Sequence, residues 1–345
     1  MKAMVIDSFG DVENFQWKDW PMPEPKTGEV RIRIQAVSVN PVDYKMRKGL
    51  IPGELPAVLG RDVAGTIDAV GEGVADFRPG DDVFAVLFGP RSNGAYAQYV
   101  ATSAAFVSHK PAGLSFTRAA TLGVAGLTGY LSVIRYGKVQ PGEDLLVAGG
   151  AGGVGSFAVP LARHCGAGSI FATAGSRESA DHLVNNLGIN SDHIIDYSNQ
   201  SIDRMDAKIR EHTDGNGVSV AFDFVGGDMK KLCFQAAGFD GRVVSAVEEP
   251  PDFDYNIWRA DISPLFAKSG SFHFVATSAR ARNGEAKDWA VFREIMVQLV
   301  DLVDSGKVSL PQVKDMGLLS EETIRQAHTL LEAGHAKGKL VLRVE

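Results

Sequence analysis

The sequence predicts an α/β fold: a doubly wound parallel sheet of six strands, preceded by a mostly β region. Strand-like and helical runs alternate from about residue 144 to residue 276, which is typical of a parallel sheet with helices on both faces. Residues 1–120 contain short apolar or alternating runs instead. A glycine-rich stretch, GGAGGVG at 149–155, stands between a strand-like run and a helical one.

The β region at the start shows little helical patterning. Its strand-like runs are MKAMVI, EVRIRIQAVSV, DVAGTIDAV and DDVFAVLF. Turn signals such as Pro79-Gly80 and Ser92-Asn93-Gly94 separate these runs. Ser115 is a suitable N-cap, and the pattern after it predicts a helix over SFTRAATLGVAGLTGYLSVI.

Six strands are expected in the parallel sheet, which is the number in a dinucleotide-binding fold. They are DLLVA (144–148), SIFATA (169–174), HIIDY (193–197), VSVAFDFV (218–225), RVVSAV (242–247) and SFHFVA (271–276). Helical runs lie between most of them, and a long helix is expected at about 286–305. Strand character returns in GKLVLRV near the last residue.

Composition excludes several classes of protein. The 345 residues are 45% hydrophobic and 22% charged, as in soluble globular proteins, and the net charge of −7 argues against nucleic-acid binding. The two cysteines, Cys165 and Cys233, are too few for a disulfide framework or a four-thiolate zinc site, and we expect a reducing, cytoplasmic location. Residues 145–162 carry no charge, but glycines and Pro160 interrupt them, so we expect no membrane span. No secretory signal is expected at the start of the chain.

The glycine-rich stretch fits the dinucleotide-binding pattern G-x-G-x-x-G at Gly150, Gly152 and Gly155. In that pattern the first glycine permits a tight turn, the second lets the backbone approach a pyrophosphate, and the third lets the helix pack on the strand. The positive end of the helix then faces the phosphates. We therefore predict a dinucleotide on the loop Gly150–Gly155, including Ala151, Gly153 and Val154.

The residues after the second strand favour NADP(H) over NAD(H). An NAD site usually places Asp or Glu about 20 residues beyond the glycines. Here Ala174 or Gly175 holds that position, followed by Ser176 and Arg177. A guanidinium matches a 2′-phosphate, whereas a carboxylate would repel it. The alternative is that Arg177 is only a solvated helix-start residue and that Glu178 holds the ribose.

Six motifs resemble the medium-chain dehydrogenase/reductase superfamily, in its zinc-free branch of quinone oxidoreductases and enone reductases, which are zeta-crystallin-like. The motifs are VSVNPVDYKMRKG (37–49), LGRDVAGTIDAVGEGV (59–74), GLTGYLSV (126–133), GGAGGVGSFAV (149–159), FDFVGG (222–227) and GKLVLRV (338–344). The resemblance implies a GroES-like catalytic domain at 1–121 and 301–345 and a Rossmann NADP(H)-binding domain at 122–300. It implies an oxidoreductase that reduces quinones or α,β-unsaturated carbonyls with NADPH.

The same resemblance implies that no zinc is bound. Zinc-dependent relatives carry a Cys after the strand that ends near Val39, a Gly-His-Glu segment and four further cysteines. This chain has VSVN and GRD (60–62) at the first two places, and it lacks the cysteine cluster. Without a Lewis acid, an acceptor activated by conjugation is the easier substrate.

Candidate catalytic residues lie in NPVDYKMRKG. Asn40 matches an Asn that lies at the nicotinamide ribose in the family, and Lys45 matches a VDxK pattern of enone reductases. Lys45 either binds the enolate oxygen or donates the proton, with Tyr44 or water as alternative donors, or it is a surface lysine. Asp43 either orients Lys45 or caps a short helix. Arg61 either points towards the substrate or pairs with Asp62.

Further cofactor contacts are expected at the ends of the later strands. Thr128 matches a Thr near the carboxamide, with helix packing as its alternative role, and Tyr197 matches a Tyr near the 2′-phosphate, with an ordinary strand-end role as the alternative. The remaining candidates are Val225, Gly226, Ser245, Ala246, Phe274, Val275, Lys337 and Lys339.

Two alternative functions stay open, and an oligomeric state is also expected. The first rival is an enoyl-thioester reductase, and the second is a low-turnover NADPH-binding protein with a structural or regulatory role. The partner of the main function is a small-molecule quinone or enone. The resemblance implies a homodimer through the edge strand of the nucleotide-binding sheet, here SFHFVA, and the need of an apolar edge strand for cover agrees with it.

Overall fold

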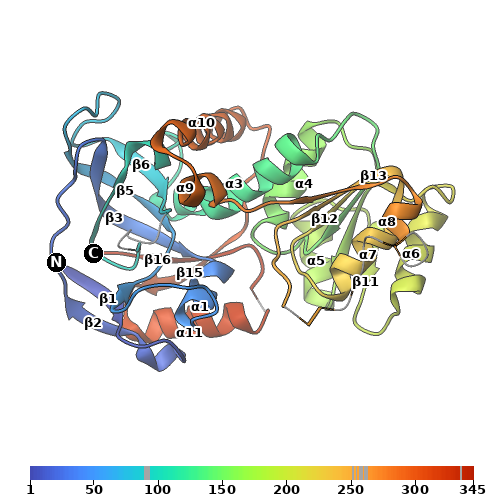
Figure 1. Cartoon of the computed structure of the whole chain (residues 1–345), viewed down its shortest axis with the longest axis horizontal. Helices are drawn as coiled ribbons and strands as arrows, with labels where there is room; N and C mark the ends of the chain where they lie inside the picture. The colour runs from blue at the N-terminus through green and yellow to red at the C-terminus, as the bar shows by residue number, and fades with distance from the viewer. Residues whose placement is uncertain (89–93, 251, 254, 256–258, 260–262, 335) are drawn as a thin grey trace. The chain divides into compact units, whose positions relative to one another are not determined.

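The computed structural model describes residues 1–88, 94–250, 252–253, 255, 259, 263–334 and 336–345. The chain divides into two compact units (Figure 1). The first unit contains Met1–Leu127, Ser278–Gly306 and Leu310–Glu345, and the second contains Thr128–Thr277 and Lys307–Ser309.

The second unit is built on a parallel six-stranded sheet in the order β11-β10-β9-β12-β13-β14. Its strands are β9 (Leu145–Ala148), β10 (Ile170–Ala174), β11 (Ile194–Asp196), β12 (Val218–Asp223), β13 (Ala237–Ser245) and β14 (Ser271–Phe274). This order is the doubly wound order of dinucleotide-binding folds, with the reversal beside β9. The predicted α/β class and the six strands are confirmed.

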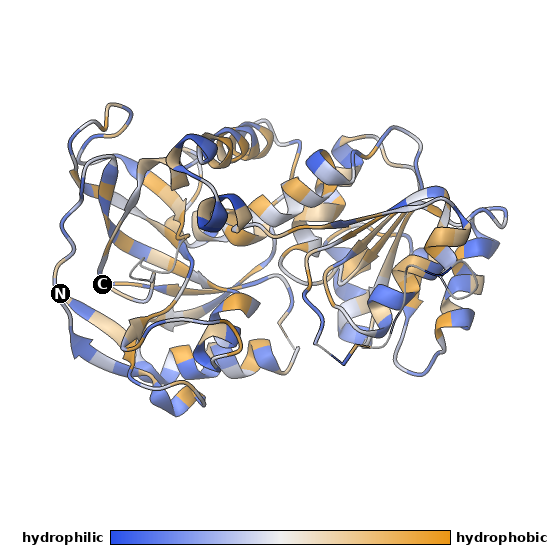
Figure 2. Cartoon of the chain, viewed as in Figure 1, coloured by the Kyte–Doolittle hydropathy of each residue, from blue (hydrophilic) through white to orange (hydrophobic). Residues whose placement is uncertain are grey.

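Helices cover this sheet and bury its apolar strands. They are α4 (Gly155–His164), α5 (Arg177–Asn185), α6 (Ile202–Glu211), α7 (Asp228–Ala236) and α8 (Pro264–Ala267). The core includes Leu146, Phe171, Ala221 and Val243, all at most 1% exposed. Figure 2 shows apolar residues along these strands. The apolar residues form nearly continuous runs within each strand because both faces of the sheet are covered.

The first unit is mostly β. One sheet has the order β15-β16-β3-β5-β6-β8, with β7 paired to β3, and a second has the order β2-β1-β4. Its strands are β1 (Lys2–Ile6), β2 (Gln16–Asp19), β3 (Glu29–Val39), β4 (Ala57–Val58), β5 (Asp62–Val70), β6 (Asp82–Val86), β7 (Tyr99–Ser103), β8 (Val107–His109), β15 (Val313–Leu318) and β16 (Lys339–Arg343). Its helices are α1 (Pro41–Arg47), α2 (Phe116–Ala119), α9 (Ala279–Asn283), α10 (Ala290–Asp304) and α11 (Glu321–Glu332).

Helix α10 belongs to the first unit, although the sequence-based boundary at residue 300 assigned most of it to the nucleotide-binding domain. Aromatic packing explains the difference. The Phe292 ring lies 4.8 Å from the Phe88 ring and 5.4 Å from the Phe106 ring, centroid to centroid. These three side chains are at most 9% exposed, so the apolar face of α10 is buried against the β region.

The single helix expected after Ser115 is interrupted. The segment forms α2, a 3-10 turn at Ala120–Leu122, α3 (Val124–Tyr130) and a π-helical segment at Leu131–Tyr136. The break lies at Gly123, where a Cβ would stand 2.2 Å from Oδ1 of Asp62. That carboxylate oxygen instead accepts a hydrogen bond of 2.7 Å from the backbone N–H of Val124. The tertiary contact therefore overrides the helical pattern.

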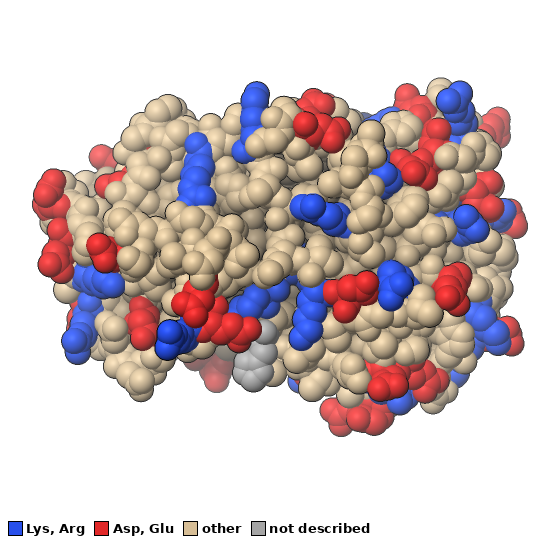
Figure 3. All heavy atoms as spheres, turned by 180° about the vertical axis from the view of Figure 1, so that it is seen from behind, with Lys and Arg blue, Asp and Glu red and all other residues tan. Residues whose placement is uncertain are grey.

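The charges on the surface and the polarity of the helices agree with what the composition predicts. Lys and Arg are interspersed with Asp and Glu on the face shown in Figure 3. Within the described part of the chain, no helix is long and apolar enough to cross a membrane.

Candidate functional site

The glycine-rich turn follows β9 and leads into α4. Gly149 has φ +84°, and its carbonyl accepts a 3.0 Å hydrogen bond from the N–H of Gly152. A Cβ on Gly155 would lie 2.3 Å from the Gly149 oxygen and 2.5 Å from Cα of Gly150. Because no side chain fits at Gly155, the start of α4 packs directly on the end of β9, as the third glycine of the motif requires.

The outer side of this turn is open. A Cβ on Gly152 would meet only the Gly149 oxygen, at 3.4 Å, and Gly152, Gly153 and Val154 are half-exposed. Among the described residues, none accepts a hydrogen bond from the backbone N–H of Gly153 or Val154. These donors stand at the positive end of α4, and such an arrangement suits an anionic phosphate.

The end of β10 presents Ser176 and Arg177. Ser176 caps α5, because its Oγ accepts a hydrogen bond of 3.2 Å from the N–H of Ser179. The side chain of Arg177 is 95% exposed and lies 3.8 Å from Asp181. The Tyr197 ring lies so close to Gly175 that a Cβ there would be 2.4 Å from the ring. The guanidinium and the tyrosine therefore flank the strand end where the 2′-phosphate was predicted.

The other cofactor candidates of the second unit differ in exposure. Val225 and Phe274 are 45% and 65% exposed, so both are accessible at their strand ends. Thr128 is buried, and its Oγ1 lies 2.7 Å from Oγ1 of Thr277. Ser245 is also buried, and its Oγ donates to Asp223, while its carbonyl accepts from the N–H of Val275 at 2.7 Å. The Ser245 hydroxyl thus links the end of β13 to the end of β12.

A buried network that the sequence analysis missed fixes the FDFVGG turn. Oδ1 of Asp223 accepts hydrogen bonds from the N–H groups of Val225 (3.0 Å) and Gly226 (2.7 Å). Lys230 donates to Oε1 of Glu249 at 2.7 Å and lies 3.7 Å from Asp223. A buried lysine between two carboxylates has no local sequence signature, because its partners lie on different segments.

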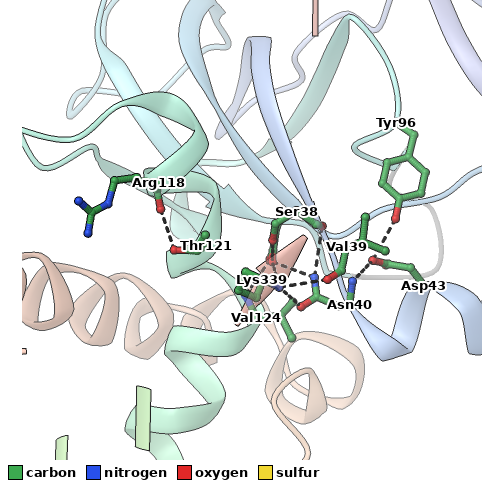
Figure 4. Close-up of polar contacts among 10 residues, drawn as sticks. Ser38, Val39, Asn40, Asp43, Tyr96, Arg118, Thr121, Val124 and Lys339 are labelled. Carbon is green, nitrogen blue, oxygen red and sulfur yellow. Dashed lines mark hydrogen bonds and ion pairs between the residues drawn. The ribbon is translucent and has the colours of Figure 1, made fainter. Parts of the chain in front are cut away.

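In the first unit, Asn40 lies inside a buried polar network (Figure 4). Its Nδ2 donates to Oδ2 of Asp62 at 2.8 Å, and its Oδ1 accepts from Nζ of Lys339 at 2.5 Å. Ser38 also donates to Oδ2 of Asp62, at 2.6 Å. The register places Ser38 opposite Asp62, and Val39 opposite the residue after Lys339, at one end of the sheet. Asn40 is 2% exposed, and its amide is hydrogen-bonded through both Nδ2 and Oδ1.

The structure corrects the assignment of Lys339 to the cofactor. Its Nζ donates to the carbonyl of Val39 (3.2 Å), to Asn40 and to Asp62 (3.3 Å). These contacts use all three ammonium hydrogens, and the side chain is 3% exposed. Lys339 therefore neutralises the buried Asp62 carboxylate and has no donor left for a phosphate. Lys337 is half-buried.

Asp43 is also buried and does not contact Lys45 in any described hydrogen bond. Its Oδ2 accepts from the backbone N–H of Asn40 at 2.8 Å and lies 3.2 Å from Oη of Tyr96. The first contact is the reciprocal half of a capping box at the start of α1. Burial raises the pKa of Asp43 to about 7. The structure thus favours the capping role over a catalytic one.

Helix α1 presents Lys45 on the side opposite to these buried residues. Asp43 and Arg47 are fully buried, whereas Lys45, two positions from each, is half-buried. Two residues correspond to about 200° around a helix. Among the three catalytic candidates, Lys45 alone reaches solvent.

Arg61, for which a direction towards the substrate and a pair with Asp62 are the two alternatives, has two contacts with other residues. Its guanidinium donates to the carbonyl of Leu87 at 3.0 Å and to the sulfur of Met46 at 3.1 Å. Burial lowers its pKa, and the charge of Arg282 acts in the same direction, while Asp43 opposes it. The guanidinium of Arg61 is thus largely removed from water. Within the described residues, no group of three or more His, Cys, Asp or Glu could hold a metal ion.

Two family models match parts of the chain. Residues 26–112 match the alcohol dehydrogenase GroES-like domain, and residues 189–342 match the model described as zinc-binding dehydrogenase. An Arabidopsis thaliana NADPH-dependent alkenal/one oxidoreductase is 31% identical over 99% of this chain and 79% of its own length.

Two solved structures are similar over nearly the whole chain. A mycobacterial protein complexed with NADPH has a TM-score of 0.86 and 26% identity, over 99% of this chain and 100% of the other. A Pseudomonas syringae quinone oxidoreductase has a TM-score of 0.84 and 27% identity, over 99% of each chain.

Proposed function

Because this chain belongs to the medium-chain dehydrogenase/reductase superfamily, we propose that it is an NADPH-dependent reductase of quinones or α,β-unsaturated carbonyls that works without zinc. The observation that carries the proposal is the open glycine turn at the start of α4, followed by an exposed arginine at the end of β10. A similar structure contains NADPH, and a relative is named as NADPH-dependent.

NADPH fits the groups that the second unit offers. The free N–H groups of Gly153 and Val154 would bind the pyrophosphate, and Arg177 with Ser176 and Tyr197 would surround the 2′-phosphate. Val225 and Phe274 are exposed at strand ends and would pack against the rest of the cofactor. When bound, the nicotinamide supplies a hydride.

Lys45 is the residue that we propose to act on the substrate. Its ammonium would donate a hydrogen bond or a proton to the carbonyl oxygen, on which negative charge develops during reduction. Asn40 and Asp43 hold the start of its helix, so they position it without touching the substrate.

Zinc does not fit this chain, despite the description of one matching family model. Arg61 would repel a cation, and both oxygens of Asp62 already accept hydrogen bonds. We therefore propose that the fixed positive charges of Lys45 and Arg61 replace a metal, which suits acceptors whose conjugation already spreads the negative charge.

Purified protein mixed with NADPH and a panel of enones and quinones tests the proposal. We expect the reduced-nicotinamide absorbance to fall with at least one acceptor. Lys45→Ala should lower kcat by about a hundredfold with little change in the affinity for NADPH. Lys314→Ala, an exposed lysine on β15, is the matched control and should behave as wild type. Tight NADPH binding without turnover of any acceptor would overturn the proposal and favour the low-turnover binding protein.

Acyl-thioester substrates distinguish the second enzyme class. If an enoyl thioester were reduced with a higher kcat/KM than every simple enone, the protein would be an enoyl-thioester reductase. A preference for simple enones or quinones supports the main proposal.

We further propose a homodimer that pairs through β14. This strand lies at the edge of the sheet, and three of its four residues, Ser271, His273 and Phe274, are exposed. Sedimentation analysis should give twice the chain mass, and a monomer at every concentration would contradict this proposal.

Free Cys165 and Cys233 suit the reducing cytoplasm, which we propose as the location of the protein.

A further inference from the structure

Tyr96 joins helix α1 to helix α11 through a buried chain of three polar side chains. Its Oη lies 3.2 Å from Oδ2 of Asp43 on α1 and 3.2 Å from Nε2 of His328 on α11. All three side chains are 0% exposed. The Phe15 ring packs edge-on against both Tyr96 and His328, which excludes water from this side of the chain.

A tyrosine hydroxyl has one hydrogen, so it cannot donate to both neighbours at once. With an ionised Asp43, the hydroxyl donates to the carboxylate and accepts from an Nε2–H of His328. With a proton on Oδ2 of Asp43, the carboxyl donates to the hydroxyl, which donates to a bare Nε2, and His328 then carries its hydrogen on Nδ1. Ionised Asp43 therefore favours the Nε2–H tautomer of His328, and a proton on Oδ2 favours the Nδ1–H tautomer.

We propose that Tyr96 and His328 are positioning residues, which hold α1 so that Lys45 meets the substrate and which couple that hold to the protonation of Asp43. The proposal rests on the proposed function only in giving Lys45 its task. The hydrogen-bonded chain itself is independent of any activity.

A second pair of residues strengthens the contact between the two helices. Arg47, four residues after Asp43, forms an ion pair with Glu332, four residues after His328. Helices α1 and α11 thus contact each other at two places, which are one helical turn apart on each helix. Lys45 lies on the solvent-facing side of α1, so the direction of its side chain depends on these two contacts between α1 and α11.

The surroundings place the change of state near neutral pH. Burial raises the pKa of Asp43 to about 7 and lowers that of His328 to about 3, so His328 stays neutral. The charged and polar groups that face these two residues are Asp62, Arg61, Lys339, Arg47, Tyr96 and the N–H of Asn40. Oδ1 of Asp43 and Nδ1 of His328 have no hydrogen-bond partner among the described residues. No further hydrogen bond at these two atoms therefore holds the chain in one of its two hydrogen-bond directions.

Nitrogen NMR of the unliganded protein with labelled histidine tests the chain directly. His328 should remain neutral between about pH 5 and pH 9 and change from the Nδ1–H to the Nε2–H tautomer with a midpoint near 7. Asp43→Asn should abolish the change. An imidazolium with an ordinary midpoint, or one tautomer throughout, would overturn the proposal.

Kinetics of variants separate positioning from simple stabilisation. Tyr96→Phe should lower kcat roughly tenfold or more, leave KM for NADPH unchanged and shift the pH profile of kcat. His328→Gln, whose amide both donates and accepts, should retain more activity than His328→Leu. Circular dichroism and NADPH affinity report whether each variant folds. Wild-type kcat and pH profile in both Tyr96→Phe and His328→Leu would reject the positioning role, and inactivity of the wild type with every acceptor would reject only the proposed function.

Discussion

Nζ of Lys339 donates a hydrogen bond of 2.5 Å to Oδ1 of Asn40, across 299 positions of the sequence. The same ammonium lies 3.3 Å from Asp62, which also binds Ser38 and the first turn of α3. The three segments that carry the first unit's candidate residues are thus fastened at one buried charge pair.

Removing that charge should destabilise the protein strongly. Lys339→Met leaves Asp62 buried without its counter-charge, which typically costs about 3–5 kcal/mol. The free energy of unfolding, measured in urea, should fall by this order. Lys337→Met, two positions earlier and without a described ion pair, should change it by less than about 0.5 kcal/mol. Equal effects of both variants would contradict the role of the buried pair.

Gly123→Ala should disturb the same network from the other side. A Cβ would stand 2.2 Å from Oδ1 of Asp62, in a position that has no slack because that oxygen already binds Val124. We expect a loss of about 1–3 kcal/mol in the free energy of unfolding. Gly113→Ala, where a Cβ would meet nothing within 4 Å, is the control and should be neutral or slightly stabilising. A neutral Gly123→Ala would show that Asp62 is free to move.

Arg177→Ala should weaken NADPH binding but not NADH binding. Loss of a charge-assisted hydrogen bond to the 2′-phosphate is worth about 1.5–3 kcal/mol, or roughly 10- to 100-fold in affinity. Calorimetric titration with both nucleotides measures the ratio. Arg204→Ala, an exposed arginine on α6, should leave the ratio unchanged. If Arg177→Ala affected both nucleotides alike, the 2′-phosphate contact would be refuted.

Asp43 should make stability depend on pH in an unusual direction. Its pKa is about 7 in the folded protein against 3.8 for the free group, so the folded state keeps a proton that the unfolded chain releases. As the pH falls from 7 towards 4, the wild type should gain stability relative to Asp43→Asn, by about 1.4 kcal/mol per pH unit. This contribution is lost again as the pH rises through 7.

His328 acts in the opposite sense, because its folded pKa of about 3 lies below its ordinary 6.5. Below that ordinary value, the unfolded chain takes up a proton that folded His328 refuses, and stability declines in both proteins. The difference between wild type and Asp43→Asn removes this effect. Urea unfolding at several pH values measures it, and a difference that stays constant with pH would mean that Asp43 titrates normally.

The sequence by itself determined the arrangement of the second unit. The alternation of strands and helices is local, and the G-x-G-x-x-G pattern constrains the backbone through the size of three glycines. Six predicted strands were therefore found within a few residues of their expected bounds. The largest difference is β13, which begins at Ala237 rather than 242, where its pairing with β12 shifts register.

Only the tertiary structure decided which polar residues of the first unit are free to act. Asn40, Asp43 and Lys45 follow one another in a single motif, yet two are buried and one is accessible. The network of Asn40 and Asp43 includes Tyr96 from a loop, His328 from α11 and Lys339 from β16. Such long-range pairing of buried polar groups leaves no periodic signal in the sequence. Burial and hydrogen-bond satisfaction are properties of the packed molecule, because each depends on which segments exclude water from the others.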